Sequence, residues 1–277
     1  MSRFLAIVHD KDIVDLERKY PRTFLFARFY LAPDVLGSDP EALMKRLLDG
    51  AKEGYRVVKM HFAPFWIDRA KEMSAHPSVD SDEFDRFFGM LADAGIPVII
   101  HVSDPDTYYA TRYTNTEWYG TKDEHLAQFE KRLAKSPGVQ FQVAHFCAQP
   151  EQDRLSNLGR MFDEYPNLFV DTGSARWMAR ELGKDVQRSR RLIETHADRI
   201  LFGTDCVARA TERDYYEGRY LTERLLLESD VRAYPLPFTD NDTVNSGGTH
   251  INGLSLPMKI LKMIYWENAA RIYRLGD

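Results

Sequence analysis

Several shortages in its composition limit what this chain of 277 residues can be. It has only 2 cysteines, Cys147 and Cys206, which are too few for a disulfide framework and are typical of reduced, buried thiols. Its longest apolar runs, such as PVII at 97–100, are far shorter than the roughly 20 residues of a membrane-spanning helix. No apolar signal segment follows Met1. We therefore expect a soluble, cytoplasmic protein with no membrane partner.

The chain also lacks an excess of basic residues. Its formal net charge is −5, with acidic and basic residues interspersed, so no basic stripe exists that would neutralise a phosphate backbone. Nucleic acid is therefore excluded as an expected partner, and a small-molecule substrate is favoured. A hydrophobic content of 44% is enough for one large core. Because barrels of about 250 residues commonly form one domain, we predict a single domain over 1–277.

Seven short apolar runs alternate with amphipathic stretches. Runs of this kind, rich in β-branched and aromatic residues and bounded by Gly, Pro or Asn, predict buried parallel strands. They are FLAIVH (4–9), TFLFARFY (23–30), RVVKMHF (56–62), PVIIHVS (97–103), VQFQVAH (139–145), NLFVDT (167–172) and RILFGTD (199–205).

Helix signals lie between and after these runs. A capping residue and a proline at 38–41 precede a leucine-rich face, and the segments 82–95, 150–165 and 214–229 also predict helices. The repeated order of strand and helix predicts an α/β fold, a (β/α)8 TIM barrel of which seven strands are recognisable. An open doubly wound sheet is disfavoured because the first strand is not followed by a glycine-rich phosphate loop. The polar, glycine-bearing segment 238–253 predicts a functional loop.

Three polar residues end apolar runs, namely His101, His145 and Asp205. The carboxyl ends of parallel barrel strands meet on one rim, where active sites lie, and strand alternation turns Lys59 and His61 inward. A lone histidine at a strand end is more often structural. A group of titratable side chains in one apolar cup is costly, however, unless a metal, a ligand or mutual pairing stabilises it. Imidazoles and a carboxylate suit Zn²⁺ or a similar divalent ion.

The ordered segments GYRVVKMHF, GIPVIIHVSDP, VQFQVAHFC, NLFVDTGSA, RILFGTD and ENAARIYRL resemble the strand signatures of a known family. This is the amidohydrolase-related family, which includes the aminocarboxymuconate-semialdehyde decarboxylase-like metal-dependent hydrolases. The resemblance covers about Phe24 to Leu275. It implies that His101 is a metal ligand, that His145 is the catalytic acid/base or a second-metal ligand, and that Asp205 is a ligand or a catalytic proton acceptor.

One family feature is missing from this chain. The family opens with a strand that carries His-x-His, which supplies two metal ligands, and no such pair occurs in this sequence. Counting backwards from Asp205 makes FLAIVH the second strand, and His9 alone does not replace two ligands. We therefore expect that the first strand is missing, that metal binding is weak or absent, and that the strands at 4–9 and 199–205 either close directly or leave a gap.

Further residues are candidates for substrate binding. Arg176 and Arg209 follow the last two strands, and their planar guanidinium groups suit a substrate carboxylate. His250, in the long polar loop, is a candidate lid residue.

Aromatic residues are concentrated in the segments after the strands at 56–62 and 97–103. They predict a wall for a planar substrate, with ordinary packing or a homodimer contact as the alternative. They are Trp66, Tyr108, Tyr109, Tyr113 and Trp118.

Together these features predict a metal-dependent hydrolase or a non-oxidative decarboxylase that acts on a small carboxylated substrate. In one form of this hypothesis the substrate is aromatic. Two alternatives remain open. One is a metal-independent, lactonase-like hydrolase in which Asp205 activates water. The other is a catalytically inactive barrel that serves as a binding subunit. Elemental analysis of the purified protein separates the first hypothesis from the others.

Overall fold

The computed structural model describes residues 4–8, 10–31, 35–53, 55–65, 67, 77–207 and 212–275. The chain divides into two compact units. The first comprises Met1–Asp104, Tyr113–Gln142 and Tyr165–Leu168, and the second comprises Pro105–Arg112, Val143–Glu164 and Phe169–Asp277. The single domain predicted from the sequence stays a prediction.

Seven strands follow one another in the sheet in the order of the chain, from β1 to β7. The ladders that join β1 to β2, β2 to β3, β3 to β4 and β6 to β7 are parallel. This confirms the predicted α/β class with seven strands, because sequential parallel order is the arrangement of TIM-barrel proteins. The strands are β1 (Phe4–Val8), β2 (Phe24–Leu31), β3 (Tyr55–His61), β4 (Val98–His101), β5 (Phe141–Val143), β6 (Leu168–Asp171) and β7 (Ile200–Leu201).

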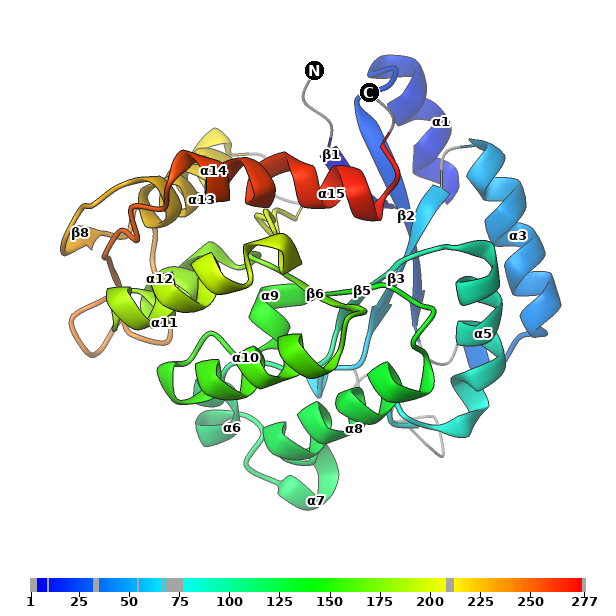
Figure 1. The fold of residues 1–277 in the computed structure, drawn as a ribbon, viewed down its shortest axis with the longest axis horizontal. Helices are drawn as coiled ribbons and strands as arrows, with labels where there is room; N and C mark the ends of the chain where they lie inside the picture. The colour runs from blue at the N-terminus through cyan, green and yellow to red at the C-terminus, as the bar shows by residue number, and fades with distance from the viewer. Residues whose placement is uncertain are drawn as a thin grey trace. The chain divides into compact units, whose positions relative to one another are not determined.

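Within the first unit, helices connect β1 to β4 and follow β4 (Figure 1). The Asp39 carboxylate accepts the backbone N–H of Ala42 at 3.1 Å and so caps the start of α3. Gly95 ends α5 in the left-handed region, with φ of 62°. These elements are α1 (Asp10–Lys19), α3 (Pro40–Glu53), η1 (Asp82–Phe84), α5 (Asp85–Ala94), α7 (Thr116–Tyr119) and α8 (Lys122–Lys135).

A fully buried arginine crosses the core of the first unit. Arg132 has 0% of its surface exposed, and its guanidinium lies 4.7 Å above the ring of Phe88. It donates to the carbonyl oxygens of Val79 and Ser81 at 2.9 and 2.8 Å, and to the Asp85 carboxylate at 2.8 Å. The buried charge is therefore paired, as a stable interior requires.

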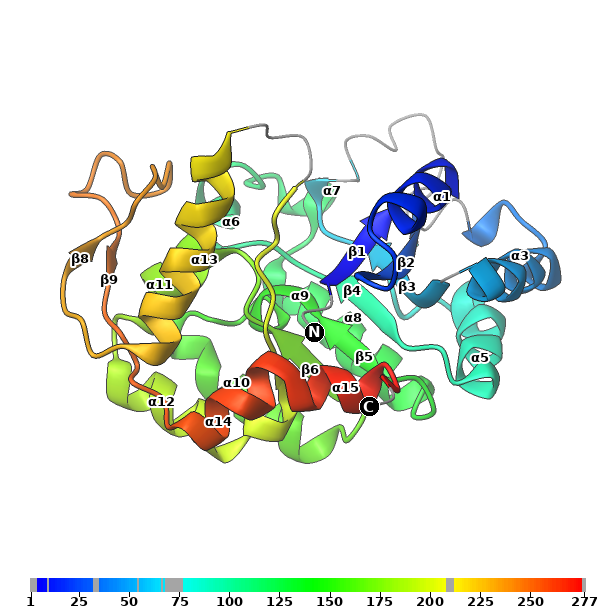
Figure 2. The ribbon, with the colours of Figure 1, turned by 90° about the horizontal axis from the view of Figure 1, so that it is seen from above.

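The second unit is mainly helical, and α11 packs against α13 (Figure 2). The predicted helix 214–229 is confirmed by α13. The segment predicted as a loop at 238–253 is only partly irregular, because its residues His250–Ile251 form a short antiparallel ladder with Tyr234–Pro235. The helices are α6 (Asp106–Thr111), α9 (Ala144–Cys147), η2 (Gln152–Arg154), α10 (Leu155–Glu164), α11 (Ala175–Leu182), α12 (Val186–Thr195), η3 (Ala197–Arg199), α13 (Arg213–Glu228), α14 (Met258–Lys262), the π-helix η4 (Met263–Glu267) and α15 (Asn268–Ile272); the strands are β8 (Tyr234–Pro235) and β9 (His250–Ile251).

Two strands are shorter than the apolar runs predict. β5 ends at Val143 and β7 ends at Leu201, so His145 and Asp205 lie beyond their strands and not at the strand ends. The physical reason is local, because both residues adopt left-handed backbone conformations, with φ of 59° and 51°, which no strand accommodates.

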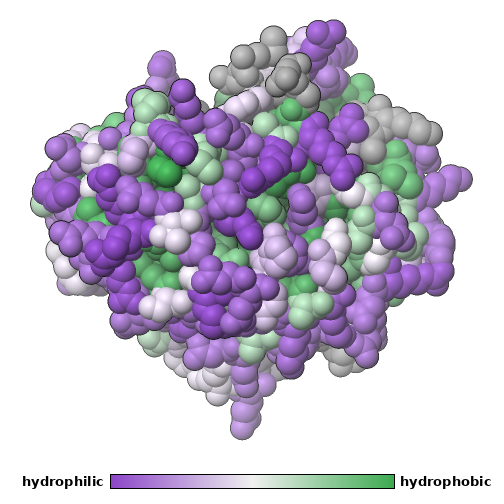
Figure 3. Space-filling model, in the orientation of Figure 1, coloured by the Kyte–Doolittle hydropathy of each residue, from purple (hydrophilic) through white to green (hydrophobic). Residues whose placement is uncertain are grey.

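The face drawn in Figure 3 is mainly hydrophilic, with small scattered apolar areas. Within the described residues, no helix combines the length and the apolar character that crossing a bilayer requires.

Candidate active site

In the first unit, two histidines stack at the ends of neighbouring strands. His61 and His101 are register partners in the parallel ladder of β3 and β4, which places their side chains on the same face. Their rings lie 4.1 Å apart between centroids, with an interplanar angle of 18°. Lys59 lies two residues before His61 on the same face and is only 8% exposed. Lys59, His61 and His101 therefore lie on one face of two neighbouring strands in this unit, and their shared substrate cavity stays a prediction.

Hydrogen bonds orient both imidazoles. The His61 Nδ1 accepts the backbone N–H of Ala63 at 3.3 Å, which assigns the proton of a neutral His61 to Nε2. The His101 Nε2 lies 3.2 Å from Asp104 Oδ1, and Tyr113 donates to the other carboxylate oxygen at 2.9 Å. A carboxylate on Nε2 leaves the lone pair of a neutral His101 on Nδ1, an arrangement that histidine ligands of metals use. Sequence reasoning missed Asp104, although the Ser-Asp-Pro turn after the strand marks a polar strand end.

In the second unit, the chain leaves β5 through a left-handed turn. Four consecutive residues, His145, Phe146, Cys147 and Ala148, have φ between 55° and 59°. None of them is glycine, and left-handed backbone costs L-residues roughly 1–2 kcal/mol each. All four are buried. Such strain persists only where surrounding contacts impose it, and it is typical of functional sites.

Asp171 supplies one of those contacts. At the end of β6, its Oδ1 accepts the backbone N–H groups of His145 and Gly173, both at 3.0 Å. A Cβ atom on Gly173 would lie 2.9 Å from that oxygen and 3.1 Å from the His145 Nδ1, so only glycine fits there. The His145 ring also packs 5.8 Å from the ring of Trp177. The carboxylate therefore fixes the backbone of His145, while its imidazole lies between the glycine and the indole.

A second carboxyl group lies nearby in an unusual state. Glu223 on α13 is 0% exposed, and neither of its carboxyl oxygens has a hydrogen-bond partner of normal geometry among the described residues. Its neighbour Thr172 has one hydroxyl proton, which it donates to the Gly203 carbonyl at 3.1 Å. Burial raises the pKa of the Glu223 carboxyl well above its usual range, and the Asp171 charge acts in the same direction. The position of a glutamate in a helical stretch does not reveal from the sequence that its side chain is buried.

Asp205 itself is exposed at the end of the loop that follows β7. The next residue, Cys206, is half-buried, and burial raises the pKa of its thiol. Cys206 is therefore an uncharged thiol at neutral pH and a poor nucleophile. Because His101 belongs to the first unit and His145 and Asp205 belong to the second, their predicted clustering stays a prediction.

The other predicted residues have varied positions. Trp118 lies on α7 with 46% of its surface exposed, and His250 is exposed on β9. Arg176 lies on α11, where its Nη2 donates to the Tyr108 hydroxyl at 3.4 Å. Arg209 and Trp66 lie outside the described residues.

The fit of a divalent metal can be tested on the donor atoms. Within the described part of the chain, no three His, Cys, Asp or Glu side chains form a group that would hold a metal ion. His101, with its carboxylate partner Asp104, has the character of one ligand, but a complete ligand set is not formed by these residues. The described donors therefore do not fit a closed metal site.

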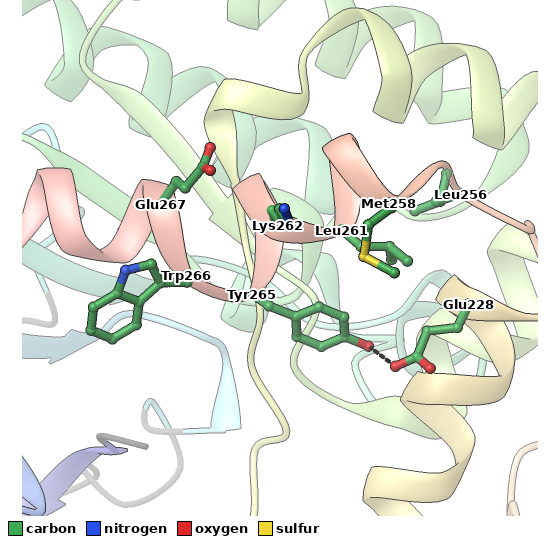
Figure 4. A pocket seen from close by; sticks show the side chains of 8 residues that line it. All are labelled: Glu228, Leu256, Met258, Leu261, Lys262, Tyr265, Trp266 and Glu267. Carbon is green, nitrogen blue, oxygen red and sulfur yellow. Dashed lines mark hydrogen bonds between the residues drawn. The ribbon is translucent and has the colours of Figure 1, made fainter. Parts of the chain in front are cut away.

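A hollow of about 600 Å³ lies elsewhere in the second unit, along α14 and η4 (Figure 4). Tyr265 points towards Glu228 and donates to its carboxylate at 2.9 Å. Apolar side chains such as Met258 and Trp266 contribute to its lining. None of the residues predicted to carry chemistry lines this hollow. We therefore do not assign the candidate site to the hollow and place it at His145 and Asp171, where the buried left-handed turn meets a carboxylate.

Comparisons with known proteins identify a family and several similar structures. A family model described as amidohydrolase matches residues 13–275. A sequence search of curated proteins found no match. The structure is similar to 2,6-dihydroxybenzoate decarboxylase complexed with 2,6-dihydroxybenzoate, with a TM-score of 0.55 and 15% identity over 96% of this chain and 75% of that one.

Two further similar structures contain manganese. One is 5-carboxyvanillate decarboxylase from Novosphingobium aromaticivorans, with a TM-score of 0.53 and 16% identity over 96% of this chain and 68% of that one. The other is dihydroxybenzoic acid decarboxylase from Polaromonas, with a TM-score of 0.54 and 15% identity over 96% of this chain and 74% of that one. At these identities the likeness establishes the fold. The family match, which spans nearly the whole sequence, shows that this chain belongs to the amidohydrolase family.

Proposed function

We propose that this protein is an enzyme that removes the carboxylate of a small aromatic acid by non-oxidative decarboxylation, with His145 as its acid/base. The observation that carries the proposal is the buried, left-handed backbone at His145, whose N–H donates to the Asp171 carboxylate and whose ring lies close to Gly173. A group held in this way is preorganised for proton transfer, which contributes about 10²–10⁴-fold to catalysis. The decarboxylases among the similar structures support the reaction class.

The proposed reaction requires one proton. The bond between the ring carbon and the carboxylate breaks, CO2 leaves, and the electron pair that remains on the ring carbon takes up the proton. His145 in its protonated form is the proposed source of that proton, and the Asp171 carboxylate holds the His145 backbone beside it. Asp205, exposed in the loop after β7, takes no part in this proton step and is proposed as a metal ligand or, in a hydrolysis, as the proton acceptor that activates water. Lys59 and His61 are proposed substrate contacts from the first unit.

A divalent ion is part of this proposal because similar structures contain one. The manganese ions of two similar decarboxylases support one here, whereas the sequence favours zinc, with His101 and Asp205 as ligands. Since the described donors do not complete a metal site, the proton step above uses only the residues of the chain. We therefore expect the ion to bind weakly, so elemental analysis of the purified chain should find much less than one metal ion per chain, and one tightly bound ion per chain would contradict this.

Hydrolysis is the second candidate, because the family model is that of amidohydrolases. His145 would then move a proton between water and the leaving group, in the presence or absence of a metal. A binding subunit without activity is the remaining alternative.

Product analysis in D2O tests these candidates together. The purified chain is incubated with 2,6-dihydroxybenzoate and with 5-carboxyvanillate, with and without added Mn²⁺, and the products are followed by NMR. Decarboxylation releases CO2 and places one deuterium on the carbon that carried the carboxylate. In parallel incubations with simple amides and lactones, cleavage of these compounds without CO2 release from the acids would favour hydrolysis. Absence of both reactions would favour the binding subunit and contradict the proposal.

A further inference from the structure

Two arginines of the second unit meet at one tyrosine. The Arg112 guanidinium lies 3.9 Å from the centroid of the Tyr108 ring, and the Arg176 Nη2 donates to the Tyr108 hydroxyl at 3.4 Å. Arg112 is exposed, whereas Tyr108 and Arg176 are half-buried. The Tyr108 side chain therefore contacts two guanidinium groups, one at its ring face and one at its hydroxyl.

Neither guanidinium has a neutralising partner. Within the described residues, Arg112 and Arg176 form no ion pair or hydrogen bond with a carboxylate. Nearby arginines differ, because Arg154 pairs with Asp106 at 2.9 Å and Arg180 pairs with Asp240 at 2.8 Å. The second unit thus pairs its neighbouring arginines and leaves these two for another anion.

The two elements that present these arginines are firmly connected. One oxygen of the buried Glu151 carboxylate accepts the backbone N–H of Asp106, at the start of α6, at 3.2 Å. The same oxygen accepts the indole N–H of Trp177, on α11, at 3.1 Å. Thr107 on α6 donates to Asp242, which also receives a hydrogen bond from Arg180 on α11. These shared acceptors fix the position of α6 against α11, so the two arginines and Tyr108 are positioned before any ligand binds.

We propose that Arg112, Arg176 and Tyr108 form a subsite for a carboxylate of the substrate. Guanidinium groups match the planar carboxylate with paired N–H donors, and an anion between them relieves the repulsion of two like charges. The neighbouring residue Trp177 packs on His145, which ties the subsite to the acid/base residue through one helix. The inference rests on the proposed function, since it assigns how that substrate is held.

Binding measurements test the subsite separately from turnover. Calorimetry with the full chain compares 2,6-dihydroxybenzoate with its uncharged amide, 2,6-dihydroxybenzamide. Arg176→Gln and Arg112→Gln should each weaken binding of the acid by about 10- to 100-fold and leave binding of the amide unchanged. Added salt should weaken binding of the acid to the wild type more than to either variant.

Arg213→Gln is the matched control, because Arg213 is an exposed arginine on α13 that pairs with Glu217. It should bind the acid as tightly as the wild type does. Equal affinities of all four proteins, or a wild type that does not bind the acid more tightly than the amide, would overturn the subsite. If the acid binds as expected but no CO2 is released, the proposed function fails while the subsite stands. If CO2 is released and both glutamine variants bind normally, only the subsite fails.

Discussion

Among the described residues, each unit contains an ionisable residue with no exposed surface, Arg132 in the first and Glu223 in the second, and the surroundings of the two side chains differ. Arg132 in the first unit is bonded to backbone carbonyls and to a carboxylate, so its charge is accommodated in the core. In the second unit, neither carboxyl oxygen of Glu223 has a hydrogen-bond partner among the described residues. The first arrangement is what stability requires, and the second lowers stability.

The same contrast extends to the backbone. In the first unit, α5 ends at Gly95, and glycine adopts the left-handed conformation without strain. In the second unit, four consecutive L-residues after β5 adopt left-handed conformations. Strain and unsatisfied polar groups persist where function maintains them. We infer that the first unit contributes mainly stability and that the second contributes the proposed chemistry.

The largest expected effect on stability concerns Arg132. Replacing it with alanine leaves Asp85 and two backbone carbonyls without their donor and opens a cavity beside Phe88. Arg132→Ala should lower the free energy of unfolding by about 3–5 kcal/mol, as measured by urea denaturation. The control Arg18→Ala removes an exposed arginine of the same unit that pairs with Asp15, and it should change stability by less than about 0.5 kcal/mol. A similar small loss for both variants would show that the buried network is unimportant.

Two glycines test the contrast through kinetics. Gly173→Ala inserts a methyl group against Asp171 and His145 and should lower kcat by about 100-fold, because small displacements of catalytic groups are costly. Gly89 is exposed on α5, and nothing lies within 4 Å of its Cβ position. Gly89→Ala should therefore raise stability by about 0.5–1 kcal/mol and leave kcat unchanged. Equal kcat values for the two variants would remove the distinction between the units.

Replacing the unpartnered carboxyl should increase stability. Glu223→Met keeps much of the side-chain volume and removes two buried oxygens without partners, so the free energy of unfolding at neutral pH should rise by about 1–3 kcal/mol. Glu164→Met, on the exposed end of α10, is the matched control with little expected change. A loss of stability in Glu223→Met would indicate that Glu223 has a stabilising partner.

The pH dependence of that effect has a definite sign. Burial raises the pKa of Glu223 in the folded chain above its unfolded value, so the folded state binds this proton more tightly. Stability should therefore fall as pH rises above the unfolded pKa of 4.5, where the unfolded carboxyl begins to ionise. Glu223→Gln does not titrate, and its advantage over the wild type should grow as the pH rises above 4.5. A difference independent of pH would show that ionisation of Glu223 is not the cause.

The strands could be predicted from the sequence, because each of the seven apolar runs overlaps a strand of the sheet. It also predicted that Lys59 and His61 share a face, since alternation along a strand is a local property. The contact between Asp171 and His145 could not be predicted in the same way. It depends on the left-handed turn after β5, and the sequence His-Phe-Cys-Ala has no glycine to signal one. Glu223 lies on a polar helix and resembles a solvated residue until its burial is known.

The central claim, that His145 is the acid/base of this protein, is tested most directly by substituting two histidines in parallel. His145→Asn and His196→Asn are compared with the wild type on the aromatic acid that the wild type decarboxylates. His196 is a suitable control because its ring stacks on Phe162 at 4.9 Å, away from the proposed chemistry, and burial lowers its pKa. We expect His145→Asn to lower kcat by about 10²–10⁴-fold and His196→Asn to retain the wild-type kcat. A folded His145→Asn variant with the wild-type kcat would contradict the account.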